Sequence, residues 1–112
     1  MKLFFAILVA FSTLALADPQ WIKVWEGDIE QPQKIHVIEE VDGNSRDHKG
    51  STARIIVRTT ATIGKLPMVI ADLETFDCVK ATYTIQSGKG GSGAPIHVKH
   101  PAEIAVYQIA CN

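Results

Sequence analysis

The chain has 112 residues, which is the length of a single domain, and 46% of them are hydrophobic. Its 11 Lys and Arg residues nearly balance 12 Asp and Glu residues, so the formal net charge is −1. This balance argues against a nucleic-acid-binding protein, which typically carries a basic stripe. It also argues against electrostatic docking on anionic membranes, which needs clusters of Lys and Arg.

The N-terminal segment has the pattern of a secretory signal peptide. Lys2 supplies a positive charge, Leu3 to Leu16 is an almost unbroken apolar run, and Ala15-Leu16-Ala17 has the small residues that signal peptidase recognises. The run is shorter than the roughly 20 apolar residues that a membrane anchor needs. We therefore expect residues 1–17 to be removed, which leaves a secreted, extracellular protein that begins at Asp18.

Beyond this leader, apolar and polar residues alternate with a period of two, which is typical of half-buried antiparallel strands. Between Ala53 and Ile63 the residues expected to face the core are Ala53, Ile55, Val57, Ala61 and Ile63. Six segments are predicted strands: 21–25, 34–41, 53–63, 67–73, 80–86 and 96–98. A polar loop at 42–51 and a glycine-rich connector at 87–93 separate some of them.

The last run, Glu103 to Cys111, is apolar on both faces when it is read with the same period, as expected of a central strand. No segment predicts a helix. The expected fold is therefore all-β, a single antiparallel β-sandwich or barrel of about seven short strands at residues 18–112.

Two cysteines follow the leader, Cys78 and Cys111. In an oxidising compartment an even number of cysteines in a short chain predicts a disulfide, and with two cysteines the pairing is unambiguous. The alternative is a pair of buried free thiols.

The glycine-rich connector contains a literal G-x-G-x-x-G pattern at Gly88, Gly90 and Gly93. A dinucleotide site needs a helix after these glycines, but the residues that follow predict a strand, so no cofactor is expected. His97 and His100 are three residues apart and would point to opposite faces of a strand, which argues against a metal site.

No arrangement of residues predicts catalysis. Serines lack a nucleophile-elbow context, and the adjacent Glu39 and Glu40 would point to opposite faces of their strand. We therefore predict a protein that is not an enzyme. A small secreted enzyme is kept as an alternative, because catalytic groups can assemble from distant segments.

Trp21, Lys23 and Trp25 form the candidate binding surface. They share one face of the first predicted strand if Ile22 and Val24 enter the core. Two indoles beside a lysine could then stack on a partner, since tryptophan is enriched in binding hot spots. The alternative is that the indoles fill the core and Ile22 and Val24 pack at an edge.

Four segments of the C-terminal half carry a family resemblance: Met68–Asp72, Ala81–Tyr83, the loop Ser87–Gly93 and the alternating run Ile104–Ile109. With them the chain resembles the insect family named for multiprotein bridging factor 2. This resemblance implies a small secreted β-rich protein, and the family name implies a transcriptional co-activator.

The expected function is extracellular binding of an unknown protein, lipid or carbohydrate partner, with no nucleic acid and no membrane anchor. A transcriptional co-activator is the alternative that the resemblance implies.

Overall fold

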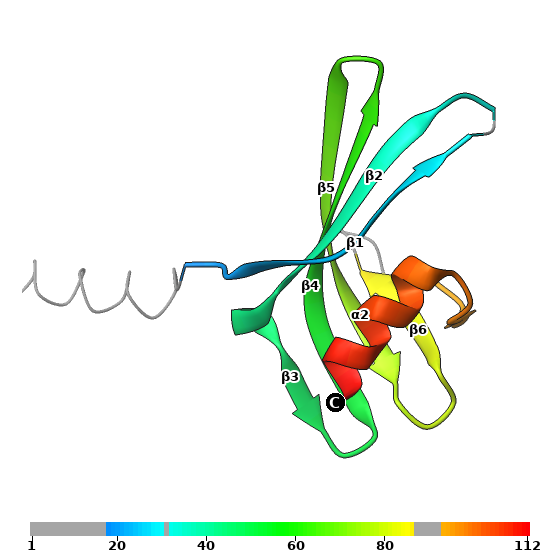
Figure 1. Ribbon diagram of the computed structural model, residues 1–112. Coiled ribbons are helices and arrows are strands. Elements are labelled where there is room, and N and C mark those ends of the chain that lie inside the picture. The colour runs from blue at the N-terminus through cyan, green and yellow to red at the C-terminus, as the bar shows by residue number, and fades with distance from the viewer. Residues whose placement is uncertain (1–17, 31, 87–92) are drawn as a thin grey trace, which may run out of the picture.

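The computed structural model describes residues 18–30, 32–86 and 93–112, which form one curved sheet and one helix (Figure 1). The predicted all-β antiparallel domain of about seven short strands with one disulfide is confirmed. The strands are β1 (Trp21–Ile29), β2 (Ile35–Asp42), β3 (Asp47–Lys49), β4 (Thr52–Ile63), β5 (Leu66–Asp77), β6 (Thr82–Gln86) and β7 (Ile96–His97). A short 3₁₀ turn, η1 (Gly43–Ser45), follows β2, and the helix is α2 (Pro101–Cys111).

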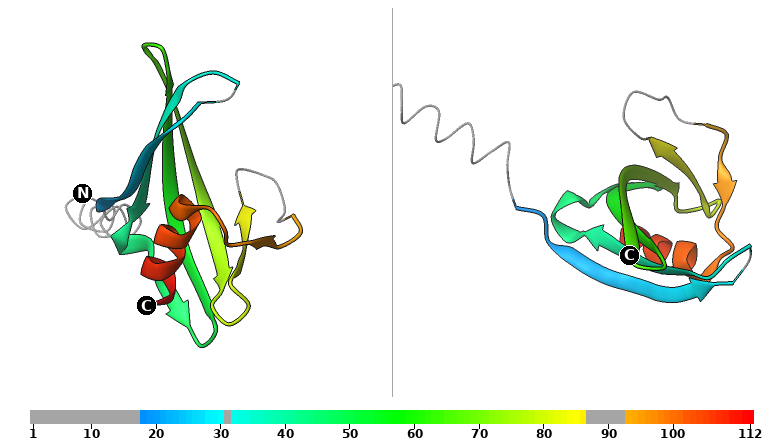
Figure 2. Two further views of the ribbon diagram at one scale, coloured as in Figure 1. Left: turned by 45° about the vertical axis from the view of Figure 1, so that its right-hand side comes forward. Right: turned by 90° about the horizontal axis from the view of Figure 1, so that it is seen from above.

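The strands form a single open sheet in the order β1-β2-β4-β5-β6-β7, with the short β3 pairing against β4. All pairings are antiparallel. Figures 1 and 2 show that α2 lies against the concave face of the sheet, and that the β1–β2 and β4–β5 hairpins extend beyond it as two arms. The helix therefore covers only part of the concave face.

The core lies between α2 and the part of the sheet that it covers. Val41, Ala53, Ile55, Val57, Phe76 and Tyr83 of the sheet are buried there with Val106 and Ala110 of the helix. Three of the residues that alternation predicted to face the core, Ala53, Ile55 and Val57, are at most 2% exposed. The concave side is thus the apolar side of the pleat.

The prediction of a strand at Glu103–Cys111, and of a protein without a helix, is wrong. Pro101 stands in the first turn, the backbone N–H of Ala102 donates to His100 Nδ1 (3.0 Å), and Glu103 Oε1 accepts from the His100 N–H (2.7 Å). These contacts satisfy N–H groups that a helix start leaves free. Ala102, Val106 and Ala110, spaced four apart, are the buried residues of α2. An apolar run on both faces fits this helical spacing as well as a strand.

The C-terminal half of α2 is fixed to the rest of the domain by a disulfide and by hydrogen bonds. The predicted disulfide is present, with the Cα atoms of Cys78 and Cys111 5.7 Å apart, and it ties the end of the helix to the turn after β5. The Tyr107 hydroxyl donates to the carbonyl of Cys78 (2.7 Å). Arg46 Nε donates to the carbonyls of Ile109 (3.0 Å) and Ala110 (3.1 Å), which lie in the last turn of the helix.

Candidate functional site

Where α2 begins, the concave face opens into a cleft of about 430 Å³. This volume lies within the range of small-molecule sites, which is roughly 300–1,000 Å³. Strands β1, β2, β4, β5 and β6 and the first turn of α2 contribute to its walls. The lining residues are Trp25, Ile29, Val37, Glu39, Thr59, Asp72, Glu74, Tyr83, Ile85, His100, Ala102 and Glu103.

Four carboxylates converge on this cleft. Asp72 and Glu74 are two apart on β5 and so share its concave face. Glu39 of β2 lies on the same face. It pairs with Thr59 of the neighbouring strand β4, and its carboxylate accepts a hydrogen bond from the Thr59 hydroxyl. Glu103 enters from the first turn of α2. The cleft therefore combines a cluster of acids with apolar walls.

Two of these acids are driven towards the neutral form. Burial, together with the nearby negative charges of Glu39, Asp72 and Glu103, raises the pKa of Glu74 to about 8. Burial also raises the pKa of Glu39, although the hydrogen bond from Thr59 and the proximity of His100 oppose this effect. Glu74 is therefore mostly protonated at pH 7.

Glu103 behaves differently because donors surround it. Burial raises its pKa, but hydrogen bonds from the Tyr83 hydroxyl and from the N–H groups of His100 and Lys99 outweigh burial, so its pKa lies below the usual value. Burial, followed by the hydrogen bond to Glu103, raises the pKa of Tyr83. Glu103 is thus a fixed anion at the start of α2.

Asp72 has an unused acceptor. Its Oδ1 atom is buried and, among the described residues, has no hydrogen-bond partner. A buried carboxylate oxygen without a donor costs free energy, since it has lost its water without a replacement. Such an atom on the wall of a cleft favours a ligand that brings a donor.

The two tryptophans do not share a face, so the predicted surface of Trp21, Lys23 and Trp25 is divided. The pairing of β1 with β2 shifts between Lys23, opposite Glu40, and Trp25, opposite Glu39. A β-bulge of this kind inserts one residue and reverses the alternation beyond it. Trp25 therefore turns to the concave face, and Val24 packs against the core.

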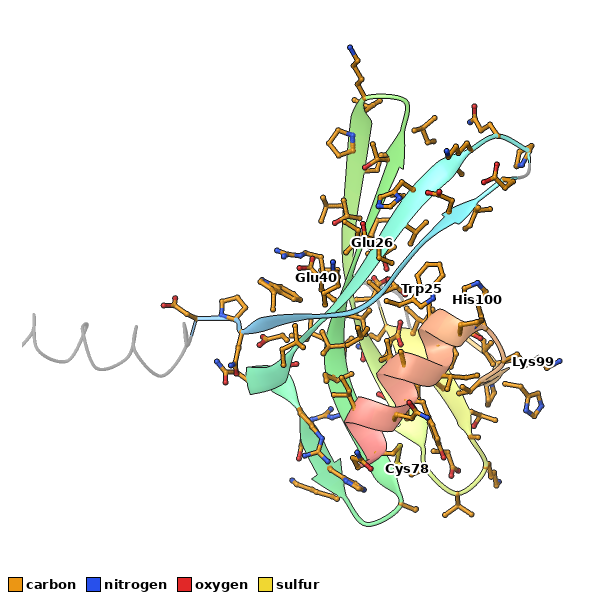
Figure 3. All side chains as sticks on the ribbon, in the orientation of Figure 1. Trp25, Glu26, Glu40, Cys78, Lys99 and His100 are labelled. Atoms are coloured by element: carbon orange, nitrogen blue, oxygen red, sulfur yellow. A yellow bond between two sulfur atoms is a disulfide. The ribbon has the colours of Figure 1, made fainter. Side chains whose placement is uncertain are left out.

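Trp25 forms one wall of the cleft. Its ring lies edge-on to the imidazole of His100, with centroids 5.2 Å apart (Figure 3). It also covers Gly27, where an added Cβ would come within 2.6 Å of the indole. The absence of a side chain at Gly27 thus allows the indole to lie flat along β1.

Trp21 and Lys23 remain together on the convex face. The guanidinium of Arg58 lies 4.1 Å from the centre of the Trp21 ring and pairs with Glu40 (2.9 Å). Glu39 and Glu40 do lie on opposite faces, as the sequence predicted. The face of the Trp21 ring is therefore already covered by the Arg58 guanidinium of the same chain.

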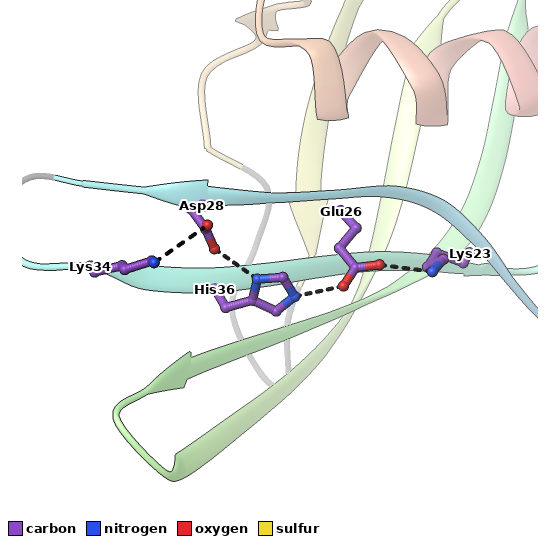
Figure 4. A network of polar contacts seen from close by, with 5 residues as sticks. All are labelled: Lys23, Glu26, Asp28, Lys34 and His36. Atoms are coloured by element: carbon purple, nitrogen blue, oxygen red, sulfur yellow. Dashed lines mark hydrogen bonds and ion pairs between the residues drawn. The ribbon is translucent and has the colours of Figure 1, made fainter.

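A chain of polar contacts continues along this convex face (Figure 4). His36 bonds through Nδ1 to Asp28 (2.7 Å) and through Nε2 to Glu26 (2.6 Å), and Glu26 also pairs with Lys23 (2.7 Å). The hydrogen bonds to Asp28 and then Glu26 raise the pKa of His36. These contacts join β1 to β2 in the part of the hairpin that extends beyond α2 (Figure 1).

In the described part of the chain, no group of three or more His, Cys, Asp or Glu side chains has the arrangement of a metal site. His100 is instead the N-cap of α2. Gly88 and Gly90 of the glycine-rich pattern lie outside the described residues, and Gly93 has open space around it. No helix among the described residues is long and apolar enough to cross a membrane.

The cleft was not predicted from the sequence because its acids come from β2, β5 and α2. One signal was present: Asp72 and Glu74 are spaced by two between Ile70 and Phe76, so the two acids share a face of β5 with these apolar residues. Acids at such positions are costly unless they have a function or a partner. No family model, curated protein or solved structure matches the chain.

Proposed function

We propose that this chain is a secreted binding protein, not an enzyme, and that its cleft takes a small organic cation: an amine or guanidinium group carried on an apolar body. The observation that carries the proposal is the buried Oδ1 of Asp72, which has no hydrogen-bond partner among the described residues and lies within a group of four carboxylates. An ammonium or guanidinium group brings donors and positive charge, and charge-assisted hydrogen bonds are stronger than neutral ones.

The walls of the cleft fit the rest of such a ligand. The face of the Trp25 indole attracts a cation or stacks on a ring, whereas Ile29, Val37 and Ile85 offer apolar contacts. A purely apolar ligand would leave Asp72 unpaired, and an anion would be repelled by Glu103. The charge and shape of the lining therefore favour an amphipathic cation.

Secretion is part of the proposal. The signal-peptide pattern at residues 1–17 and the Cys78–Cys111 disulfide both fit an oxidising, extracellular environment. The co-activator role implied by the family resemblance would require the leader to remain uncleaved. A tag fused after Asn112 distinguishes the two: secretion predicts the tag in the medium, whereas a co-activator would be retained in the nucleus.

The binding test is a calorimetric titration of the disulfide-bonded protein with phenethylamine and with phenethyl alcohol, which share an apolar body and differ in charge. We expect the amine to bind at least about tenfold more tightly, which corresponds to about 1.4 kcal/mol. Asp72→Asn should remove most of this preference. Asp47→Asn is the matched control, because Asp47 pairs with Arg54 on a different part of the sheet (3.4 Å).

Equal binding of the amine and the alcohol, or an unchanged preference in Asp72→Asn, would contradict the proposal. Thermal unfolding of each variant shows that it is folded before the titration is compared.

Protonation gives a second, independent signature. A bound cation favours the ionised form of Glu74, so binding releases a proton while the pH is below the pKa of about 8. The affinity for phenethylamine should therefore rise with pH and level off above about pH 8. Glu74→Gln should flatten this rise, and Glu39, whose pKa burial also raises, contributes to the dependence that remains.

A further inference from the structure

Besides the edge strand β1, which pairs only with β2, the described part of the sheet has an open edge along the first part of β5. This strand pairs with β4 from Leu66 to Asp77, but with β6 only from Leu73 to Asp77. Residues 66–72 therefore have a strand on one side only. Their side chains are unusually apolar for an open edge: Leu66 is 68%, Met68 51%, Val69 60% and Ile70 54% exposed. Natural sheets usually protect such an edge with charges or cover it.

The backbone groups on this open side can be assigned. Ile63 and Leu66 pair across the two-residue turn at Gly64-Lys65, with Gly64 at φ +63°, and in hairpin turns of this length the flanking pair is the hydrogen-bonded one. Leu66 thus points its N–H towards β4, and alternation directs Pro67, Val69 and Ala71 to the open side.

The far end of β5 agrees with this assignment. The N–H of Cys78, an even-numbered position, donates to the carbonyl of Ser51 on the β4 side (2.8 Å). The carbonyl of Asp77, an odd-numbered position, accepts from the N–H of Ala81 on the β6 side (2.9 Å). The register between β4 and β5 has no shift along its length.

We infer that this edge pairs with the same edge of a second copy of the chain, in antiparallel orientation about a two-fold axis at Val69. In that register Val69 faces Val69 of the second copy, and Pro67 faces Ala71. Every open N–H, at Val69 and Ala71 of each copy, then finds a carbonyl at Val69 or Pro67. Pro67, which has no N–H, lies opposite Ala71 at the end of the seam. The carbonyl of Ala71 is therefore left without a protein donor, and water reaches it there.

The side chains match in this register as well. Residues opposite each other in an antiparallel pair lie on the same face, so Met68 meets Ile70 of the second copy on the concave side and the two Val69 side chains meet on the convex side. A seam centred one residue earlier would place Pro67 opposite Val69 and leave a central carbonyl without a donor. The proline position thus excludes the Met68-centred register, and a seam centred on Ile70 would place Pro67 opposite Leu73, which already pairs with Gln86 of β6.

The charges near the open edge of β5 also favour a second copy of the chain as its partner. Between Lys65 and Asp72 the edge carries no charged residue. In the Val69-centred register Lys65 of each copy lies opposite Leu73 of the other copy, one residue from Asp72, so a lysine and an aspartate approach each other at both ends of the seam. A parallel arrangement would instead place lysine beside lysine. An isologous contact of this kind closes on itself and gives a dimer with one continuous sheet.

The seam is short compared with a stable interface of about 800 Å² per partner, so the dimer should be weak and depend on concentration. The test is sedimentation velocity of the disulfide-bonded protein from about 1 µM to 1 mM, a range that brackets weak affinities. The average mass should rise from monomer towards dimer. Val69→Lys should remain monomeric at every concentration, whereas Val79→Lys, the same change at a valine that is 79% exposed in the turn after β5, should behave as wild type.

A second variant tests the register. Paired residues in a hydrogen-bonded position have Cα atoms about 5.5 Å apart, within the range of a disulfide. Val69→Cys should therefore form a covalent dimer under mild oxidation, and Val79→Cys should not. A wild-type protein that stays monomeric to 1 mM, equal association of Val69→Lys and wild type, or equal cross-linking of the two cysteine variants would overturn the inference.

Discussion

The hydroxyl of Tyr83 donates to the carboxylate of Glu103 and so joins β6 to the first turn of α2. The other oxygen of Glu103 accepts from the N–H groups of Lys99 (2.9 Å) and His100 (2.7 Å). One carboxylate therefore fixes the start of the helix to the sheet and to the segment that precedes it. The wall of the cleft depends on this arrangement, because His100 and Glu103 both line it.

Replacement of Tyr83 by Phe should reduce the free energy of unfolding by about 1–3 kcal/mol, since it removes a hydrogen bond to a charged group and retains the buried ring. The pKa of Glu103 should rise, because one of the donors that lowers it is lost. Urea unfolding measures the first effect and carboxyl-carbon NMR titration the second. An unchanged pKa of Glu103 would show that the hydroxyl does not act on it.

The helix makes a prediction that a strand at the same residues does not. Val106 is 1% exposed and Ile104 is 39% exposed, whereas in a strand both would share one face. Val106→Ala should therefore destabilise the protein by about 1–3 kcal/mol, and Ile104→Ala should cost well under 1 kcal/mol beyond its helix-propensity effect. Comparable losses in urea unfolding would instead favour the strand.

Loss of the disulfide should cost about 3–4 kcal/mol of unfolding free energy, because the cross-link restricts the unfolded chain over a separation of 33 residues. The measurement is urea unfolding of the wild type with and without a reductant. In the Cys78→Ser/Cys111→Ser variant the reductant should have no effect, and this variant should match the reduced wild type. A reductant that leaves wild-type stability unchanged would contradict this expectation.

Glu74 should make the protein less stable as the pH rises. Its pKa is about 8 in the folded protein and near 4.5 when solvated, so folding favours the protonated form. The contribution is fully present below about pH 4.5 and is lost as the pH rises through 8. At 1.4 kcal/mol per pKa unit the loss is on the order of 3 kcal/mol, allowing for partial solvation.

Glu74→Gln should remove this loss. The unfolding free energies of Glu74→Gln and the wild type are measured in urea at several pH values. The difference between them should shift in favour of the variant as the pH rises from about 4 to above about 8. Glu30→Gln, at an exposed position, is the control and should not change the pH profile. A difference between Glu74→Gln and wild type that is constant with pH would show that Glu74 titrates normally.

His36 should titrate above the usual histidine value of about 6.5 in an NMR experiment, because Asp28 and then Glu26 stabilise its charged form. The stabilising contribution of these contacts is present below the ordinary pKa and is lost as the pH rises through the raised one. Asp28→Asn should lower the pKa of His36, since it removes the partner with the larger effect. A pKa of His36 that is the same in Asp28→Asn and in the wild type would contradict this expectation.

The sequence predicted β2, β4 and β6 well because these strands are wet on one face, so their alternation is visible, whereas the predicted segments 21–25 and 67–73 cover only part of β1 and β5. It missed β3 because Asp47, His48 and Lys49 are all polar and pair only with β4. The helix was missed because a run that is apolar on both faces has no distinct period. Pro101 and Glu103, at the first and third positions of the helix, were nevertheless a start signal.

The functional surface was harder to predict, for two physical reasons. An inserted residue at Val24 reverses the alternation of β1, so Trp25 lies on the face opposite to the one that a regular strand predicts. The cleft itself depends on the curvature that brings β2, β5 and α2 together, and alternation within one segment contains no information about curvature. Only the acids on the apolar face of β5 marked the site locally.

The Cys78–Cys111 bond also determines how the protein responds to force. It encloses β6, β7 and α2 in a covalent ring and leaves β1 to β5 outside, and Asn112 follows the second cysteine directly. A pull applied between Asp18 and Asn112 therefore loads the strands before Cys78 and bypasses the ring. Under oxidising conditions the chain can extend only by the length of residues 18–78, and adding a reductant lengthens that extension by the segment between the two cysteines.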